Sequence, residues 1–353
     1  MFIYILNLVM IFLWALFITT TIKKNKDLIF IILISTQLIL LSLLRDLNVG
    51  ADTAVYVNRF HIIAQTAWER IFQLSDIVDF EIGFIILNKL IGIVWENESF
   101  FLAVTSSIII LSISKYIYKN SKIVWLSFVI FIAFGFWGMS LNTLRQFIAI
   151  ALILPSIKYI KSRDLIKFVI HILIASFFHI SALSFLIIYP LFKMKINKFY
   201  ITLVICIGVA VNLFSTKIIY FLMGIFGYHL YVGRVGNGSG TGMLLMLSLI
   251  AIAALLYRRS AIRNGEDYDL YIHILIVSIL LNILALDFNL AGRAMIYFTI
   301  HCIILIPNII YTIKPKMDRS VGIYIVLLGA MFYYLIILTT DVGSVVPYQI
   351  MSR

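Results

Sequence analysis

Long apolar runs separated by short polar turns dominate the pattern of this chain. As helices, runs of this length cross the apolar core of a bilayer, which is about 30 Å thick. The pattern predicts membrane-spanning helices over residues 2–22, 28–44, 100–118, 123–140, 141–160, 199–222, 241–257, 270–287, 294–313 and 321–340. The chain is therefore predicted to be an all-α polytopic membrane protein.

Two further apolar segments do not fit a simple span. Residues 165–192 are too long for one untilted helix and carry basic clusters at both ends, so we expect a hairpin of two short helices that breaks near His179. Residues 81–95 are only weakly apolar and contain Lys89. This indicates an interfacial or re-entrant helix inside an outer loop over 45–99.

The composition supports the membrane class, because 63% of the residues are hydrophobic and 12% are charged. The net charge of +12 gathers in short loops between spans, where it sets orientation, so nucleic-acid binding is excluded. Cys206 and Cys302 lie inside apolar runs, which indicates neither a disulfide framework nor a thiolate metal site. We expect one integral membrane domain over 1–353, with roughly 11–14 transmembrane helices, a polar cavity at the outer face and a Gly-rich outer loop over 223–240.

Lysines and arginines separate between the two faces when the N-terminus is placed outside. This topology puts 14 of the 16 lysines into cytoplasmic loops, but 7 of the 12 arginines on the outer side. The positive-inside rule explains the lysines and not the outer arginines. Because the guanidinium presents a fork of donors that fits phosphate or carboxylate, the outer face is predicted to hold an anion. The alternative is that individual arginines snorkel at the interface or pair with neighbouring acids.

Four polar motifs fall on the outer side under this topology. The first runs from Arg45 to Tyr56 and combines two acids, a guanidinium, a glycine and a hydroxyl. Gly50 permits a turn through which Arg45 and Asp52 approach one another. The structural alternative is that Asp52 or Thr53 simply caps the start of a helix.

The other three motifs lie at the ends of predicted helices. Asn142, Arg145 and Gln146 open a span, where an arginine costs several kcal/mol unless it is paired or faces a wet cavity. Residues 177–181 form the tip of the predicted hairpin, and residues 287–293 join two late spans. Their common placement favours one functional site at the outer face.

The same residues carry a family resemblance. An Arg-x4-Gly-x-Asp-Thr-x2-Tyr loop, an Asn-x2-Arg-Gln helix start, a Phe-His-x-Ser, a late arginine and a terminal Pro-Tyr are similar to the EpsG family of Wzy-type polysaccharide polymerases. In this chain the motifs consist of Arg45, Gly50, Asp52, Thr53, Tyr56, Asn142, Arg145, Gln146, Phe178, His179, Ser181, Arg293, Pro347 and Tyr348. The resemblance spans nearly the whole chain, and its first three motifs are the specific ones. The usual glycine before the acid is Ala51 here.

The resemblance implies an enzyme that polymerises undecaprenyl-diphosphate-linked oligosaccharide repeat units into O-antigen or exopolysaccharide, with undecaprenyl diphosphate as the leaving group. It further implies a multi-pass protein of the bacterial cytoplasmic (inner) membrane, with its active site facing the periplasm or the cell exterior. A chain-length-regulating co-polymerase and a flippase are the implied partners. Three other classes stay open: a lipid-linked oligosaccharide flippase, an O-antigen ligase or acyltransferase-like transferase, and a scaffold for an export complex.

Two kinds of chemistry are expected from the outer residues. Proton abstraction from an acceptor hydroxyl needs a base within hydrogen-bond reach, for which His179 and Asp52 are equal first candidates and Asp46 the next. A diphosphate leaving group gains negative charge in the transition state, and arginines in a partly dehydrated pocket can stabilise that charge. Because the outer loops contain no Asp-x-Asp signature, we expect neither a metal nor another cofactor.

The substrate-binding residues are expected to be mainly arginines. Arg145 and Arg293 are the first candidates for the diphosphate, followed by Arg45 and by Arg234. Arg234 lies in the Gly-rich loop, which is either a lid over a sugar or a disordered connector. The polar neighbours expected to bind substrate are Gln146, Asn142, Thr53, Tyr56 and Tyr348.

Overall fold

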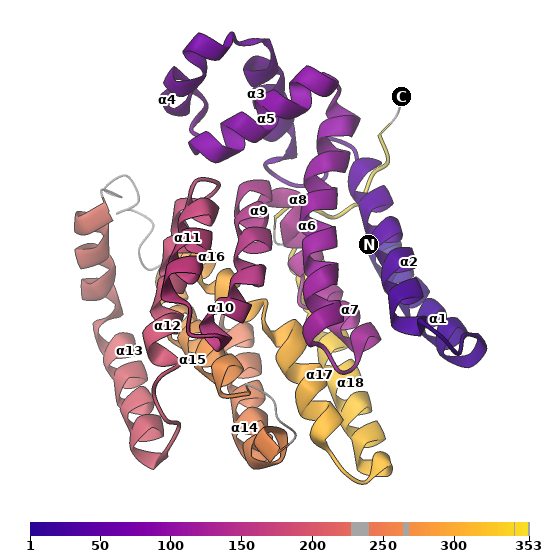
Figure 1. Cartoon of the computed structure of the whole chain (residues 1–353), viewed down its shortest axis with the longest axis vertical. Helices are drawn as coiled ribbons and strands as arrows, with labels where there is room; N and C mark the ends of the chain where they lie inside the picture. Colours follow the sequence, from indigo (N-terminus) through magenta and orange to yellow (C-terminus); the bar gives the residue numbers. More distant parts are fainter. Residues whose placement is uncertain (227–239, 264–267, 342, 352–353) are drawn as a thin grey trace.

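The computed structural model describes residues 1–226, 240–263, 268–341 and 343–351. Within this part of the chain every regular element is a helix (Figure 1). The helices long and apolar enough to cross a membrane are α1 (Phe2–Thr21), α2 (Lys26–Leu43), α6 (Glu98–Asn120), α13 (Lys198–Phe226), α14 (Thr241–Arg263), α15 (Tyr268–Ala285), the pair α16 (Asn289–Thr299) and α17 (Cys302–Thr312), and α18 (Lys316–Thr340). They give eight candidate spans among the described residues, and they confirm the predicted all-α membrane architecture.

Two of the predicted spans are interrupted. α7 (Val124–Ala133) and α8 (Phe136–Asn142) meet at a bend of 55°, where the sequence predicted one helix. The following span consists of α9 (Leu144–Ile153), a 3-10 turn at 154–156 and α10 (Ile157–Lys161). Pro155 lies in that turn, and proline interrupts a helix because it lacks the amide donor. The bend therefore ends α7 at Ala133, and the separate helix α8 ends at Asn142 of the second outer motif.

A cap of short helices lies at one end of the bundle (Figure 1). It consists of α3 (Thr53–Gln65), a 3-10 helix η1 (Trp68–Gln73), α4 (Ser75–Val78) and α5 (Ile82–Val94). Phe60 of α3 stacks on Phe101 of α6 with 4.7 Å between ring centroids, which holds the cap on the bundle. Lys89 of α5 donates to the carbonyl oxygens of Ala64 (2.6 Å) and Thr66 (2.7 Å), so this lysine satisfies the end of α3.

Residues 165–192 form the short hairpin that the sequence predicted. Its arms are α11 (Leu165–Ser176) and the 3-10 helix η3 (Ile180–Ile187), which continues as α12 (Ile188–Leu191). The tip docks on the cap, because the amide of Gly83 donates to the carbonyl of Phe177 (2.8 Å). A Cβ at Gly83 would meet that carbonyl at 2.7 Å, so only glycine permits the close approach. The docking brings His179 next to the start of α5.

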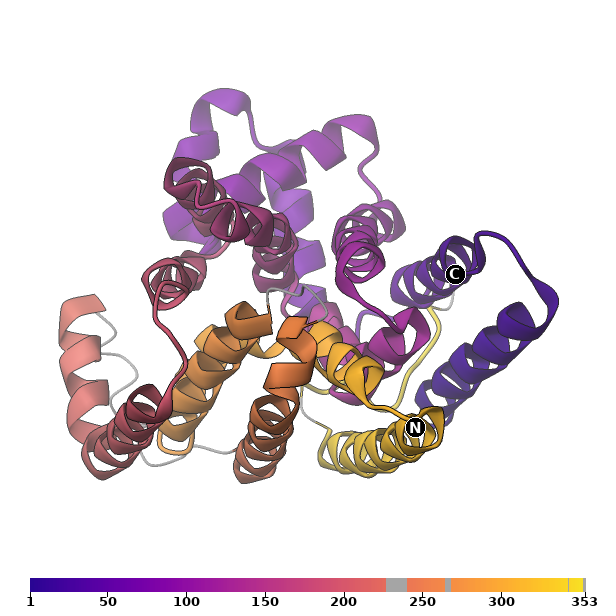
Figure 2. The same ribbon diagram turned by 60° about the horizontal axis from the view of Figure 1, so that its bottom comes forward.

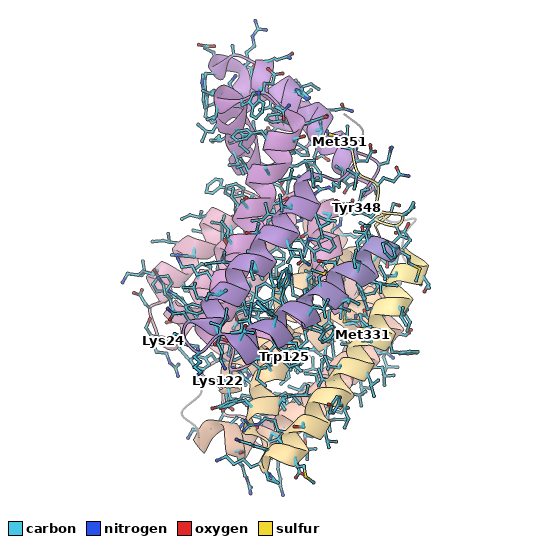
Figure 3. All side chains as sticks on the ribbon, turned by 90° about the vertical axis from the view of Figure 1, so that its right-hand side faces the viewer. Lys24, Lys122, Trp125, Met331, Tyr348 and Met351 are labelled. Atoms are coloured by element: carbon cyan, nitrogen blue, oxygen red, sulfur yellow. The ribbon has the colours of Figure 1, made fainter. Side chains whose placement is uncertain are left out.

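The basic turns gather at the end of the bundle opposite the cap. The amide of Lys122 donates to Asn308 of α17 (2.9 Å), and Tyr189 donates to the carbonyl of Arg163 (2.8 Å). Lys24 and Lys122 lie well below Tyr348 and Met351 in Figure 3. The structure therefore separates the lysine-rich turns from the predicted outer motifs, as the sequence topology requires.

The C-terminal segment 341–351 crosses the cap end of the bundle and fixes the loop that follows α2. The amide of Met351 donates to the carbonyl of Leu44, and the amide of Asp46 donates to the carbonyl of Gln349, both at 2.9 Å. The amide of Gly50, which has a φ of 97°, donates to the carbonyl of Ser344 (2.8 Å). α13, in contrast, lies at the edge of the bundle (Figures 1 and 2), and only 11% of its span is buried.

Candidate functional site

A polar cavity of about 260 Å³ lies between the cap and the bundle. Four parts of the chain far apart in sequence meet there: the cap, the start of α9, the tip of the hairpin and the first turns of α16. Its lining residues are Asp52, Val55, Tyr56, Arg59, Asp79, Phe80, Thr143, Arg145, Gln146, His179 and Arg293. The cavity thus contains residues of all four outer motifs, together with three guanidinium groups.

Glu81 connects two of the predicted site residues. Its Oε1 accepts from His179 Nδ1 (2.8 Å), and its Oε2 accepts from Arg145 (2.5 Å). The backbone amide of Ile180 also donates to Oε1 (3.3 Å). The side chains of Glu81, His179 and Arg145 are 21%, 13% and 19% exposed, so the network is mostly shielded from water. Such a shielded network fixes the orientation of each member.

The charge state of Glu81 follows from these contacts. Burial raises the pKa of the Glu81 carboxyl, but the hydrogen bond from His179 and the charge of Arg145 outweigh burial and place the pKa below its ordinary value. The stabilisation from this carboxylate is therefore complete above the unfolded pKa of about 4.3 and is lost as the pH falls through the lower folded value. Because the ionised carboxylate only accepts, His179 Nδ1 carries the donated proton, so in the neutral imidazole Nε2 is the acceptor.

Arg145 is held on several sides. It donates to the carbonyl of Asp79 (3.1 Å), and its guanidinium lies 4.7 Å from the centre of the Phe80 ring. Burial raises the pKa of the Tyr56 phenol, a shift that a hydrogen bond with Arg145 opposes. Arg59 also lies over Phe80, at 4.8 Å. Phe80 therefore carries two guanidinium groups in cation–π contact and aligns them along the cavity.

Arg293 stands at the opposite wall of the cavity, in the first turns of α16. Its backbone carbonyl accepts from Gln146 Nε2, which ties α16 to α9. Its side chain is exposed and forms no hydrogen bond or ion pair with any described residue. Arg293 therefore has no acidic partner among the described residues, whereas Arg145 is paired with Glu81.

The structure places other predicted site residues outside the cavity. Arg45 is fully buried and donates to the carbonyls of Ser42 (2.7 Å) and Leu141 (3.1 Å), and it forms no ion pair with Asp52. Thr53 Oγ1 donates to the carbonyl of Val49 (2.7 Å). These side chains satisfy backbone carbonyls where the loop after α2 packs on the end of α8.

Four more predicted residues have structural contacts or lie outside the described part. Asn142 Oδ1 accepts from the Asp52 amide (2.8 Å), and Tyr348 donates to the carbonyl of Leu41 (2.5 Å). Asp46 Oδ1 accepts from the backbone and side chain of Asn48, a local turn. Arg234 and most of the predicted Gly-rich loop lie outside the described residues.

Replacing Arg45 by methionine is expected to lower the thermal midpoint of the detergent-purified protein and its membrane level. The change leaves the Ser42 and Leu141 carbonyls without their donor, at a cost of about 1–3 kcal/mol for each buried group. Arg70→Met is the matched control, since Arg70 is exposed on the cap. A thermal midpoint equal to that of the control, with polymer lost, would assign Arg45 to substrate binding instead.

The cavity also contains Val55, Arg59, Asp79 and Phe80, which the sequence argument did not select. Asp52, Val55, Tyr56 and Arg59 follow one another at helical spacing, so one face of α3 lines the site. That spacing could have identified Arg59 from the sequence. Glu81 gave no such signal, because its partners lie 64 and 98 residues away.

The cavity can bind an anion and accept a proton. Arg59, Arg145 and Arg293 supply positive charge, while His179 and Asp52 supply acceptors. In the described part of the chain, no group of three His, Cys, Asp or Glu side chains is arranged to hold a metal ion. Together, these features define a multi-pass membrane protein with an arginine-rich site at the cap end of its bundle.

The comparison with protein families identifies the chain more closely. The EpsG family matches residues 28–350 of the 353, so the chain belongs to the EpsG family, the family of Wzy-type polymerases. No curated protein and no solved structure matches the chain. The matched range includes all the residues that line the polar cavity.

Proposed function

We propose that this protein is a membrane glycosyltransferase that polymerises undecaprenyl-diphosphate-linked repeat units into O-antigen or exopolysaccharide. The family and the many apolar helices fit a polymerase of this kind. The observation that carries the proposal is the cavity, which is lined both by a histidine that Glu81 holds and by an arginine that has no acidic partner among the described residues. In this proposal the protein lies in the bacterial inner membrane, with the cap and the cavity on the periplasmic or outer side.

The reaction transfers a growing glycan from its lipid carrier to a sugar hydroxyl of a new unit. The acceptor oxygen bonds to the anomeric carbon of the donor, and the bond from that carbon to the diphosphate oxygen breaks. The hydroxyl proton goes to His179 Nε2, while Glu81 holds Nδ1 and stabilises the imidazolium that forms. Asp52 is placed to bind and orient the acceptor sugar.

Undecaprenyl diphosphate leaves with the electron pair of the broken bond, and arginine side chains of the cavity stabilise the negative charge that it gains. Arg293 is the principal contact, because its charge is not compensated by a described acid. Arg145 and Arg59 add to the potential, and Phe80 restricts how they move. Interactions that strengthen as the leaving group gains charge accelerate the reaction.

The test is a deletion strain that carries the wild-type gene or a site variant at matched membrane levels. We expect the deletion to collapse the glycan ladder to a single repeat unit and the wild-type gene to restore it. Absence of the single unit would indicate an earlier role, as a flippase or a priming transferase. Full-length polymer left on the lipid carrier would indicate a ligase.

Chelation is expected to leave polymerisation unchanged in washed membranes. The reason is that guanidinium groups occupy the place where a divalent cation would otherwise neutralise the diphosphate. The measurement compares ladder formation with and without EDTA. Loss of the ladder, with recovery on adding a divalent cation, would show that the reaction needs a metal.

A further inference from the structure

A second, larger cavity adjoins the polar one. Its volume is about 680 Å³, within the range of about 300–1,000 Å³ that is typical of ligand sites. It lies among α1, α8, α14, α15, α16 and α18. The two cavities share Thr143, Gln146 and Arg293 in their walls. One continuous ligand can therefore occupy both.

The larger cavity differs from the polar one in chemistry. Its wall is made mainly of aliphatic and aromatic side chains, such as Trp137, Met243 and Ile337. Arg293 is the single charged residue among those that line it, and it lies at the junction with the polar cavity. An apolar chamber with one cationic group at its mouth matches an amphiphile that has an anionic headgroup.

Gln146 gives an independent indication of a ligand at the junction. Its side chain is 2% exposed, and its Nε2 donates to the carbonyl of Arg293. Its Oε1 is buried and has no hydrogen-bond partner among the described residues. An unpaired buried acceptor costs free energy, and a hydroxyl or amide of the sugar attached to the diphosphate would satisfy it.

We propose that the larger cavity holds the polyprenyl chain of the donor substrate, in the stretch nearest to its diphosphate. That the apolar part of the ligand is a polyprenyl chain rests on the proposed function. That its headgroup lies in the polar cavity and its apolar part in the larger one rests on the two adjoining cavities. A ligand with its chain among α8, α14 and α18 and its diphosphate at Arg293 directs its glycan into the polar cavity, towards His179. The donor is then oriented by its lipid as well as by its charge.

Glycines in the wall allow this cavity to be filled without disturbing the backbone. A Cβ at Gly138 of α8 meets only Val345, at 3.8 Å, and a Cβ at Gly242 of α14 meets no heavy atom within 4 Å. Gly138→Leu and Gly242→Leu therefore place a side chain in the chamber from two separate helices. Gly329→Leu is the matched control, because Gly329 of α18 also has open space but does not line the cavity.

The experiment measures binding to the detergent-purified protein of two probes, farnesyl diphosphate and inorganic diphosphate. We expect both filling variants to lower the affinity for farnesyl diphosphate about 10-fold or more, a change of about 1.4 kcal/mol in binding free energy. Their affinity for inorganic diphosphate should be unchanged. The Gly329→Leu control should match the wild type for both probes. A purified filling variant that binds farnesyl diphosphate like the wild type overturns the proposal.

Two further arms separate this inference from its alternatives. Phosphatidylglycerol that displaces farnesyl diphosphate at equal concentration would assign the cavity to a bilayer lipid and overturn the proposal. Arg293→Ala is expected to lower the affinity for both probes. If it lowers the affinity for neither, the diphosphate does not bind at this junction and the proposed site is wrong. A normal ladder in the deletion strain would contradict the polymerase function itself, whatever the probes show.

Discussion

Replacement of His179 by alanine is expected to lower the rate of polymer formation by about 10²–10⁴-fold, the usual contribution of a general base. The imidazole lines the cavity, and because Glu81 accepts from its Nδ1, Nε2 is the ring nitrogen that remains for proton transfer in the proposed reaction. The protein should still reach the membrane, since the backbone contact between Gly83 and Phe177 holds the hairpin tip. The measurement is the initial rate of ladder growth at matched protein levels.

His171→Ala is the control for this prediction. His171 lies in the same hairpin, and its ring contacts the carbonyl of Lys167 and the ring of Tyr159, away from the cavity. Glu81→Gln tests the positioning role, because the amide keeps the size of the side chain but loses the charge that fixes the His179 tautomer. We expect it to alter the pH profile of the rate. A His179→Ala variant with full activity would move the base to Asp52.

The helices were predictable because hydropathy and length determine them one at a time. Most long apolar runs became one helix at nearly the predicted position, for example α1 (Phe2–Thr21) for the run over 2–22, whereas the runs over 123–140 and 141–160 were each divided. Lys24 and Lys122 also lie towards one end of the molecule, away from Tyr348 and Met351, in agreement with the sorting of lysines (Figure 3). The bend between α7 and α8 was not predictable in this way, because an apolar run does not state where its helix changes direction.

The site could be located from the sequence only in part. The motifs indicated which face would carry it, and the cavity does gather Asp52, Arg145, His179 and Arg293. The role of each arginine depended on contacts across the fold. Arg45 and Arg293 look alike as single residues beside apolar runs, yet one is fully buried against carbonyls and the other faces the cavity.

Glu81 shows the limit most clearly. It lies directly before α5, in a segment predicted to be an interfacial or re-entrant helix. Its importance comes from docking of the hairpin tip on the cap, which brings His179 to its Oε1 from 98 residues away. A contact between two residues that lie 98 positions apart produces no periodic pattern in a single sequence.

Replacement of Arg293 by alanine is the second change with a large expected effect, a loss of about 10²–10³-fold in polymerisation rate. The side chain has no described partner, so its removal leaves no buried acid or carbonyl unsatisfied and should not lower the membrane level. Arg293→Lys keeps the charge but loses the planar fork, and we expect an intermediate rate. The measurement is the ladder in the deletion strain, with Arg70→Ala as a control on an exposed arginine of the cap.

The comparison of Arg293 with Arg145 decides how the leaving group is stabilised. Arg145→Ala removes the partner of Glu81 as well as a positive charge, so it should lower both the rate and the thermal midpoint. Arg293→Ala should lower the rate alone. If the Arg293 variant instead polymerises at the wild-type rate while Arg145→Ala is inactive, the diphosphate lies against the cap, over Phe80, and the arginine at the junction of the two cavities has no part in the reaction.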